Sequence, residues 1–123
     1  RDFAKKNSLN VFFAGARKDV ERFYAAADIF LFPTRYEPFS NVCLEAMAGG
    51  CAVVTTAQNG ASEVISDEFV MKNPNDPKIL QIIKKLLDDS NFLADTQQQN
   101  REKSTYFSVE RNLAETMSIL ERV

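Results

Sequence analysis

Short apolar runs alternate along the chain with stretches in which apolar residues recur every three or four positions. The runs cover residues 10–14, 29–32, 52–56 and 69–71, and Gly15 and Pro33 close the first two. Runs that are apolar throughout, rather than at every second position, are typical of strands buried on both faces of a parallel sheet. We therefore expect up to four strands, the last of them short.

Helical periodicity fills the segments between these runs. After Asp19, a candidate N-cap, four apolar residues share one helical face at Val20, Phe23, Tyr24 and Ala27. A second helix is expected to open at Ser40 or a neighbouring residue and to end at the Gly49–Gly50 pair, with a short helix over 61–65. These helices would connect successive strands.

The C-terminal part of the chain is predicted to be helical. Asp76 caps a helix that Pro77 begins, and its inner stripe is formed by Ile79, Ile82, Ile83, Leu86 and Leu87. A weaker helix is expected over 92–103. The last helix follows the N-cap candidate Ser108 and is expected to bury Val109, Leu113, Met117 and Leu120. Strands alternating with helices predict one α/β domain, a Rossmann-like parallel sheet with helices on both faces.

Composition narrows the possible functions. The chain has 123 residues, enough for one domain, and its net charge of −2 gives no basic field for nucleic acid. It has no histidine, which excludes a histidine acid, base or metal ligand within these residues. No apolar run is long enough to span a bilayer. Cys43 and Cys51 are expected to be buried free thiols, as in a reducing cytoplasm.

Two glutamates at one strand-to-helix junction are the strongest candidates for chemistry. Glu37 follows the strand 29–32, in the zone at the carboxyl ends of the strands where α/β sheets bind ligands. Glu45 lies in an otherwise apolar helix that we expect to be buried, so its carboxylate needs hydrogen-bond donors. Ribose hydroxyls would supply them. A backbone N–H, or a cation such as Arg17 or Arg35, would satisfy Glu45 equally well.

The start of the same helix is a candidate phosphate site. Unpaired amides are expected at Ser40, Asn41, Val42 and Cys43, and the helix dipole adds positive potential there. Neither glycine-rich phosphate motif, GxGxxG or GxxxxGK, occurs in the chain. The amides alone would therefore hold the phosphate.

Two other uses of a carboxylate pair are disfavoured. A glycosidase needs one carboxyl group with a raised pKa, whereas a helix N-terminus favours the ionised form. A divalent metal would require a third acidic ligand, and none lies at suitable spacing, since Asp19, Asp28 and Glu63 are more simply explained as caps or strand-edge residues.

The residues from the second strand onward resemble the donor-binding half of retaining GT-B glycosyltransferases of family 4. The resemblance is carried by A-D-I-x-x-x-P at 27–33, by E-x7-E at Glu37 and Glu45, by E-A-M-A-x-G at 45–50 and by N-G-A-S-E-V at 59–64. It covers about residues 10–87. The segment 15–20 is similar to lipopolysaccharide-core enzymes of that family.

The resemblance implies a role for each residue. Glu45 would bind the ribose of the nucleotide, and Glu37 would contact hydroxyls of the donor sugar and act as the catalytic residue. The amides of Phe39, Ser40, Asn41 and Val42 would hold the sugar and pyrophosphate, while Ala16 and Arg17 would border the base. The implied reaction is transfer of a hexose, most simply from a UDP-sugar, to a glycolipid or polysaccharide acceptor, with retention of configuration and without an essential metal or other cofactor.

The resemblance also implies what the chain lacks. Family members often have glycine where Ser40 stands, and their donor domain begins with two further strands and a basic pair. We thus expect a truncated C-terminal half of a GT-B fold, without the acceptor domain, inactive alone and prone to self-association through open sheet edges. The parent would act in the cytoplasm, at the inner face of a membrane. The alternative is an isolated nucleotide-binding or interaction module without catalysis.

Overall fold

The computed structural model of the chain, described here for residues 1–122, has an α/β fold built on a parallel sheet. The strands β1 (Ile29–Phe32), β2 (Ala52–Thr56) and β3 (Val70–Met71) lie in the order β1-β2-β3. Ile29 is opposite Ala52, and Thr55 is opposite Val70. The predicted fold class and the three strands from residue 29 onward are confirmed.

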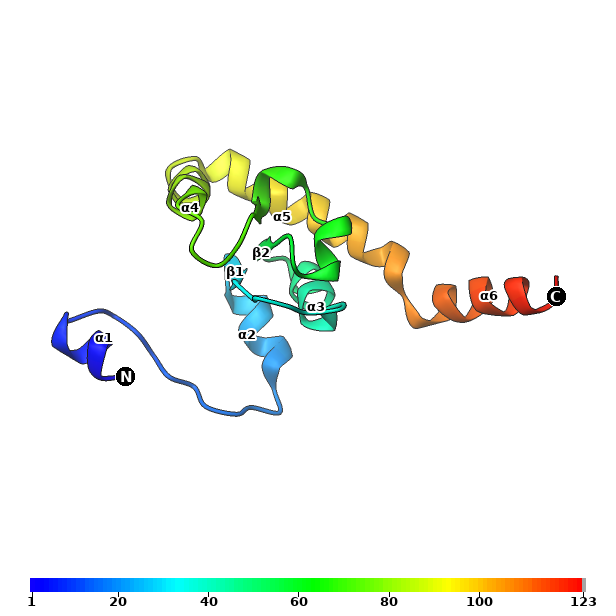
Figure 1. The fold of residues 1–123 in the computed structure, drawn as a ribbon, viewed down its shortest axis with the longest axis horizontal. Coiled ribbons are helices and arrows are strands. Elements are labelled where there is room, and N and C mark those ends of the chain that lie inside the picture. The colour runs from blue at the N-terminus through cyan, green and yellow to red at the C-terminus, as the bar shows by residue number, and fades with distance from the viewer. Residues whose placement is uncertain (123) are drawn as a thin grey trace.

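Helices precede, connect and follow these strands (Figure 1). Helix α2 (Val20–Ala26) leads into β1, and α3 (Asn41–Gly49) connects β1 to β2. The 3-10 turns η1 (Gly60–Glu63) and η2 (Asp67–Phe69) connect β2 to β3. The chain continues through α4 (Lys78–Asp88), α5 (Ser90–Ser104), η3 (Thr105–Phe107) and α6 (Val109–Leu120), and a short α1 (Asp2–Lys6) opens it.

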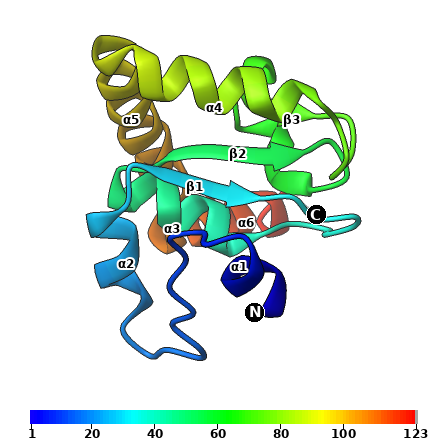
Figure 2. The ribbon, with the colours of Figure 1, turned by 90° about the vertical axis from the view of Figure 1, so that its left-hand side faces the viewer.

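The core surrounds β2, the central strand. All five residues of β2 are buried, so helices and turns cover both of its faces. Helix α3 packs on β1 and β2, and α5 packs on β2 and α3. The largest fully buried side chains of this core are Met47, Met71 and Leu86. Helix α4 lies on the β3 side of the sheet and α2 on the β1 side (Figure 2).

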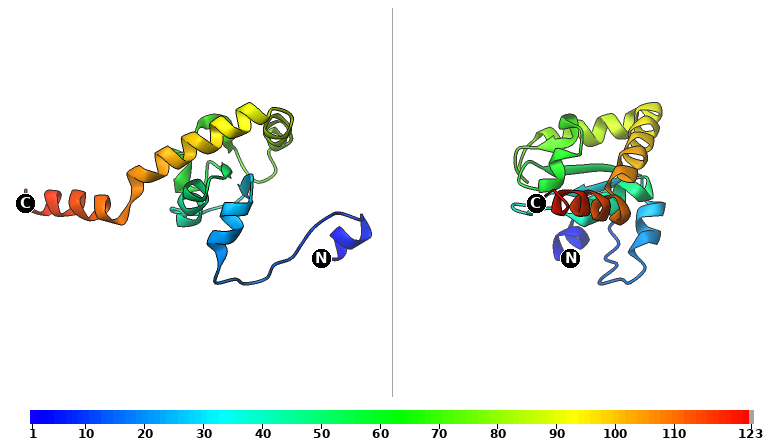
Figure 3. Two further views of the ribbon diagram at one scale, coloured as in Figure 1. Left: turned by 180° about the vertical axis from the view of Figure 1, so that it is seen from behind. Right: turned by 90° about the vertical axis from the view of Figure 1, so that its right-hand side faces the viewer.

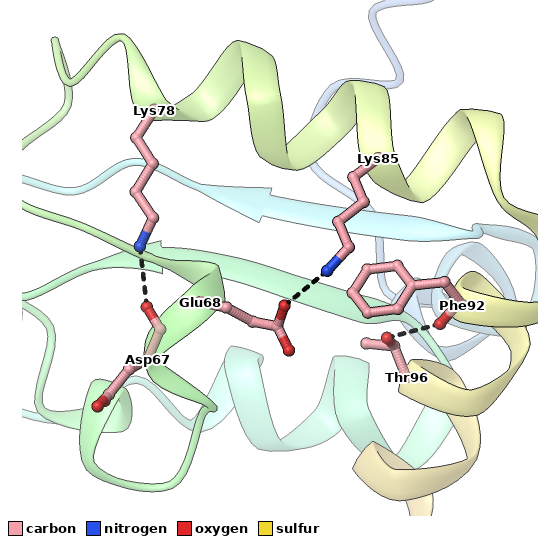
Figure 4. Close-up of polar contacts among 6 residues, drawn as sticks. All are labelled: Asp67, Glu68, Lys78, Lys85, Phe92 and Thr96. Atoms are coloured by element: carbon pink, nitrogen blue, oxygen red, sulfur yellow. Dashed lines mark hydrogen bonds and ion pairs between the residues drawn. The ribbon is translucent and has the colours of Figure 1, made fainter.

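Two lysines attach α4 to its neighbours (Figure 4). Lys78 Nζ donates hydrogen bonds to the carbonyl oxygens of Asp67 and Val70, at 3.0 and 3.1 Å. Lys85 Nζ pairs with Glu68 at 3.1 Å and lies 3.7 Å from the centre of the Phe92 ring on α5. These contacts hold the polar edge of α4, while its apolar stripe faces the core.

Most of the predicted α4 stripe is correct. Ile82 and Leu86 are buried, and Ile79 and Ile83 are half-buried. The prediction for Leu87 is wrong: its side chain is 66% exposed. A residue directly after the fully buried Leu86 is turned by about 100° around a helix of 3.6 residues per turn, which takes it off the buried face here.

Helix α5 is longer than predicted at both ends. It begins at Ser90 because the Asp89 carboxylate caps it, accepting a hydrogen bond from the Phe92 N–H at 2.9 Å. Asn100, which is buried, donates from Nδ2 to the carbonyl oxygen of Cys51 at 2.9 Å. This bond fastens α5 to the start of β2.

The predicted strand over residues 10–14 does not form. Val11, Phe12 and Phe13 are 50%, 84% and 48% exposed, in an extended segment that runs with α1 away from the sheet (Figure 1). A strand needs a neighbour for its backbone groups, and no described strand pairs with this segment. The side of β1 that faces away from β2 is likewise unpaired among the described residues, so self-association through it stays a prediction.

The outer helices also bury less than predicted. On α2, Tyr24 is half-buried, whereas Val20 and Phe23 are 39% and 40% exposed. Helix α6 begins after the Ser108 cap as expected, yet it extends outward from the rest of the fold (Figure 3). The apolar stripe of α6 is exposed at Leu113, Met117 and Leu120. The predicted burial of the Val109 side chain falls outside what the structure describes.

No helix within residues 1–122 is long and apolar enough to cross a bilayer.

Candidate functional site

The loop after β1 places Glu37 beside the turn that follows β2. Glu37 forms an isolated parallel bridge with Asn59: its N–H donates to the Gln58 carbonyl at 3.0 Å, and its carbonyl accepts from the Gly60 N–H at 2.9 Å. Glu37 itself is half-buried. As predicted, it lies just beyond the carboxyl ends of the parallel strands, where sheets of this kind bind ligands.

The side chain of Asn59 is the buried centre of this turn. Its Nδ2 donates to Thr55 Oγ1 at 3.0 Å and to Cys43 Sγ at 3.4 Å, while its Oδ1 accepts from the Ala61 N–H at 3.0 Å. One amide side chain therefore links β2, the first turn of α3 and the start of η1.

The N-terminus of α3 is open to an anion. No acidic residue lies in its first turn, and the buried N-cap residue Ser40 makes no side-chain capping bond. The expectation of a free amide at Cys43 is wrong, because that N–H donates to the Ser40 carbonyl at 3.1 Å. Burial raises the pKa of the Cys43 thiol, so it brings no negative charge to this end of the helix near neutral pH.

Glu45 is exposed, contrary to the prediction that its helix would be buried all round. Helix α3 buries only one face, formed by Cys43, Ala46 and Met47, and turns Glu45 away from it. Glu45 Oε2 accepts a hydrogen bond from the Tyr24 hydroxyl on α2 at 3.4 Å. No basic side chain in the described part of the chain pairs with Glu45.

Two hollows flank Glu45, and its side chain lines both. The first, of about 420 Å³, lies between α2 and α3 and is lined by Val20, Glu21, Tyr24, Glu45, Ala48 and Gly49. The second, of about 500 Å³, lies at the start of α3 and is lined by Phe39, Asn41, Leu44, Glu45, Phe107 and Asn112. Glu45 thus stands on the rim that the two hollows share.

The structure brings together part of the predicted donor site. Phe39 and Asn41 line the second hollow with Glu45, whereas Ser40 is buried behind them and Val42 is half-buried. Glu37 lines neither hollow, and its backbone is held against the turn formed by Gln58, Asn59 and Gly60.

Ala16 and Arg17 are not brought into either hollow. Both lie exposed in the segment before α2, where Arg17 pairs with Asp19 at 2.9 Å and lowers the pKa of that carboxyl group. This pair replaces the predicted capping bond, since the Asp19 side chain makes none.

Of the residues that line the hollows, the sequence pointed only to Phe39, Asn41 and Glu45 as site residues, and among those it missed are Tyr24, Phe107 and Asn112. Tyr24 was identified only as part of an apolar stripe, and its hydroxyl group was the one available signal. Phe107 and Asn112 belong to the far C-terminal part of the chain and carry no local motif.

The chain is similar to enzymes that transfer sugars. O-antigen chain mannosyltransferase B of Escherichia coli is 37% identical over 75 residues, which cover 59% of this chain and 20% of that protein. Lipopolysaccharide glucosyltransferase WaaG of Escherichia coli (strain K12) is 43% identical over 58 residues, 47% of this chain and 16% of WaaG. The chain thus spans only a small part of these relatives.

Solved structures support the same relationship. Sucrose-phosphate synthase from Thermosynechococcus elongatus superposes with a TM-score of 0.82 at 26% identity, covering 98% of this chain and 32% of that one. A crystal structure of WaaG, described as a glycosyltransferase involved in lipopolysaccharide biosynthesis, gives a TM-score of 0.77 at 27% identity and covers 97% and 34% of the two chains. The sequence profile described as Glycosyl transferases group 1 matches residues 2–103. The chain therefore belongs to the group 1 glycosyltransferase family.

Proposed function

We propose that this chain provides part of the donor site of a retaining family 4 glycosyltransferase that uses a nucleoside-diphosphate hexose, most simply a UDP-hexose. Membership of the group 1 family supports glycosyl transfer in general. The single observation that supports the donor site most strongly is the position of Glu45 on the shared rim of two hollows beside the open N-terminus of α3.

Because Glu45 is exposed, its burial is not the reason to assign it a ribose. A buried carboxylate would have required ribose hydroxyls as donors, whereas this one is reached from solvent. Its functional value comes from its position: one hollow is walled by Tyr24 and Gly49, and the other by Phe39 and Asn41. A ribose bound at the rim would donate hydroxyl hydrogen bonds to Glu45 and direct the rest of the nucleotide into these hollows.

The start of α3 would hold the diphosphate. Favourable charge interactions at a helix N-terminus contribute about 0.3–1 kcal/mol each, and more where partly buried. The first turn adds no competing carboxylate, and the side chain of Asn41 lines the adjoining hollow. Positioned N–H groups stabilise the charge that develops on the departing diphosphate, a contribution that often dominates group transfer.

The proposed reaction needs no proteinaceous base. The bond between the anomeric carbon and the phosphate oxygen breaks, and its electron pair leaves with the nucleoside diphosphate. The acceptor hydroxyl oxygen bonds to the same face of that carbon, and its proton passes to a donor phosphate oxygen. Glu37 would contact hydroxyls of the hexose, and no essential metal is involved.

The names of the relatives indicate the class of acceptor. One relative is described as an O-antigen chain mannosyltransferase, and WaaG is described as a lipopolysaccharide glucosyltransferase. We propose a glycolipid or polysaccharide acceptor for the whole protein, bound at the cytoplasmic face of a membrane.

The segment with Ala16 and Arg17 precedes Val20, which lines the first hollow, and we retain this segment as the proposed border of the nucleobase.

Titration calorimetry of the chain with UDP, ADP and GDP tests this proposal. We expect one nucleotide to bind selectively, and Glu45→Ala to weaken it about tenfold or more, since a hydrogen bond to a charged group contributes about 1.5–3 kcal/mol. As a control, Glu68→Ala removes an exposed carboxylate that pairs with Lys85 on α4, and it should leave the affinity for the nucleotide unchanged. A folded chain that binds none of the three nucleotides would point to an interaction module instead.

A further inference from the structure

The backbone of Glu37 is held by a second loop of the chain. Both of its backbone polar groups are bonded to the turn formed by Gln58, Asn59 and Gly60, called the 58–60 turn below. The bridge lies outside the named strands, so the sheet itself does not hold Glu37. The position of the Glu37 backbone thus depends on the 58–60 turn.

Gly60 approaches the Glu37 loop too closely for any side chain. A Cβ atom built on Gly60 would lie 1.9 Å from the Pro38 carbonyl oxygen and 3.3 Å from Phe39 Cα. Those neighbours are backbone atoms, which cannot rotate aside as a flexible side chain can. Gly60 does not have a positive φ angle, so space rather than backbone conformation requires glycine here.

The 58–60 turn is itself anchored on three sides. The Asn59 side chain, fully buried, bonds Thr55 on β2 and Cys43 on α3. Gln58 Nε2 donates to the carbonyl oxygen of Lys72, just after β3, at 2.7 Å. The turn therefore transmits the position of β2, α3 and the end of β3 to the loop that carries Glu37.

We infer that the 58–60 turn is a positioning element for the donor sugar, and that Gly60 is its positioning residue. Its close contact with Pro38 sets where the Glu37 carboxylate stands relative to the start of α3. This inference depends on the proposed role of Glu37 in contacting the hexose. It adds a specificity device: the turn would govern recognition of the sugar and leave recognition of the nucleotide to Glu45.

The two roles separate in a binding experiment. UDP presents the ribose and diphosphate, whereas UDP-glucose adds the hexose, so the ratio of their affinities isolates the hexose contribution. Gly60→Ala forces the Pro38 carbonyl away and displaces Glu37. We expect Gly60→Ala to lower the affinity for UDP-glucose about tenfold more than the affinity for UDP, a difference of about 1.4 kcal/mol.

A double variant distinguishes positioning from general damage. Glu37→Ala should lower the same ratio, and Glu37→Ala combined with Gly60→Ala should lower it no further, because both changes remove one interaction. Ile82→Val, in the buried core on α4, is the control for lost stability and should leave the ratio unchanged. Additive losses in the double variant, or equal losses for UDP and UDP-glucose, would overturn the inference.

Hydrogen exchange tests the backbone hydrogen bonds between Glu37 and the 58–60 turn without any ligand. The Glu37 amide, bonded to Gln58, should exchange slowly in wild type and faster in Gly60→Ala. If circular dichroism shows that Gly60→Ala does not fold, Gln58→Ala, at an exposed residue, replaces it and should change both readouts in the same direction. Unchanged exchange and an unchanged ratio would refute the positioning role. A wild type that binds no nucleotide refutes the proposed function. The exchange rates still decide whether the 58–60 turn holds the Glu37 backbone in place.

Discussion

The hydroxyl group of Tyr24 lies 3.4 Å from Glu45 Oε2, so α2 meets α3 at the carboxylate in the centre of the candidate site. The Tyr24 ring is held edge-on against Phe30 with ring centres 5.6 Å apart, and its carbonyl accepts a hydrogen bond from Cys51 Sγ. Gly49 allows this approach, because a Cβ there would lie 2.6 Å from Tyr24 Cβ. Tyr24 is thereby placed to orient Glu45.

Tyr24→Phe should weaken nucleotide binding without unfolding the chain. The variant keeps the ring that packs on Phe30 and loses only the hydroxyl that bonds Glu45. At 3.4 Å this bond to a carboxylate is long, so we assign it about 0.5–1.5 kcal/mol and expect a loss of about two- to tenfold in UDP affinity by calorimetry. Tyr106→Phe, at an exposed residue of η3, is the matched control. Equal affinities for wild type and Tyr24→Phe would show that Tyr24 does not orient Glu45.

The ionisation of Tyr24 should depend on Glu45. Burial first, and the charge of Glu45 second, raise the pKa of Tyr24 above its ordinary value of 10.0. The folded pKa thus exceeds the unfolded one, so the related stability is fully present below about pH 10 and is lost as pH rises through the folded pKa.

The difference between the tyrosinate absorbance titrations of wild type and Tyr24→Phe isolates this group. Glu45→Gln should lower the pKa of Tyr24 only in part, since burial remains. A Tyr24 that titrates at or below its ordinary pKa would contradict the contact with Glu45.

The strands and helices from residue 20 onward could be predicted from local pattern, because their caps and apolar spacing act over a few residues. The Asp89 cap that extends α5 is a local signal of the same kind that was overlooked. Residues 10–14 show the limit of this reasoning. Apolar residues favour a strand, yet a strand forms only where a neighbour accepts its backbone hydrogen bonds.

The exposure of Glu45 and of the α6 stripe could not be deduced from the local sequence. Helix α3 is apolar on nearly every side, but it is covered on only one, so its sequence does not reveal which residue faces outward. The spacing of Leu113 and Met117 indicates a helix with an apolar face, and no described element lies against that face. The contact of the 58–60 turn with Glu37 could likewise not be predicted from local sequence, because it joins two loops that are separate along the chain.

Two neighbouring leucines on α4 test the described core. Leu86 is fully buried and Leu87 is 66% exposed. Leu86→Ala should lower the free energy of unfolding by about 2–5 kcal/mol, through lost burial and the cavity that remains. Leu87→Ala should change it by less than about 0.5 kcal/mol, as for other surface substitutions. Urea unfolding measures both, and comparable losses in the two variants would mean that α4 is rotated from its described position.

The attachment of α5 to β2 can be tested in a similar way. Asn100→Ala leaves the Cys51 carbonyl without its buried donor and should cost about 1–3 kcal/mol of unfolding free energy. Gln97→Ala, one turn earlier, removes a bond to the Asp28 carbonyl in an exposed place where water can substitute, and should cost much less. If thermal unfolding ranked Gln97→Ala as the more damaging change, the described contact of α5 with β2 would be wrong.

The most direct test of the donor site is to follow backbone amide NMR signals while UDP is added. The account predicts that the largest shifts gather at Phe39, Asn41, Val42 and Glu45, with a second group at Tyr24 and Gly49, while Lys85 and the rest of α4 stay unchanged. Shifts centred on α4, or no shifts at millimolar UDP in a folded sample, would contradict it.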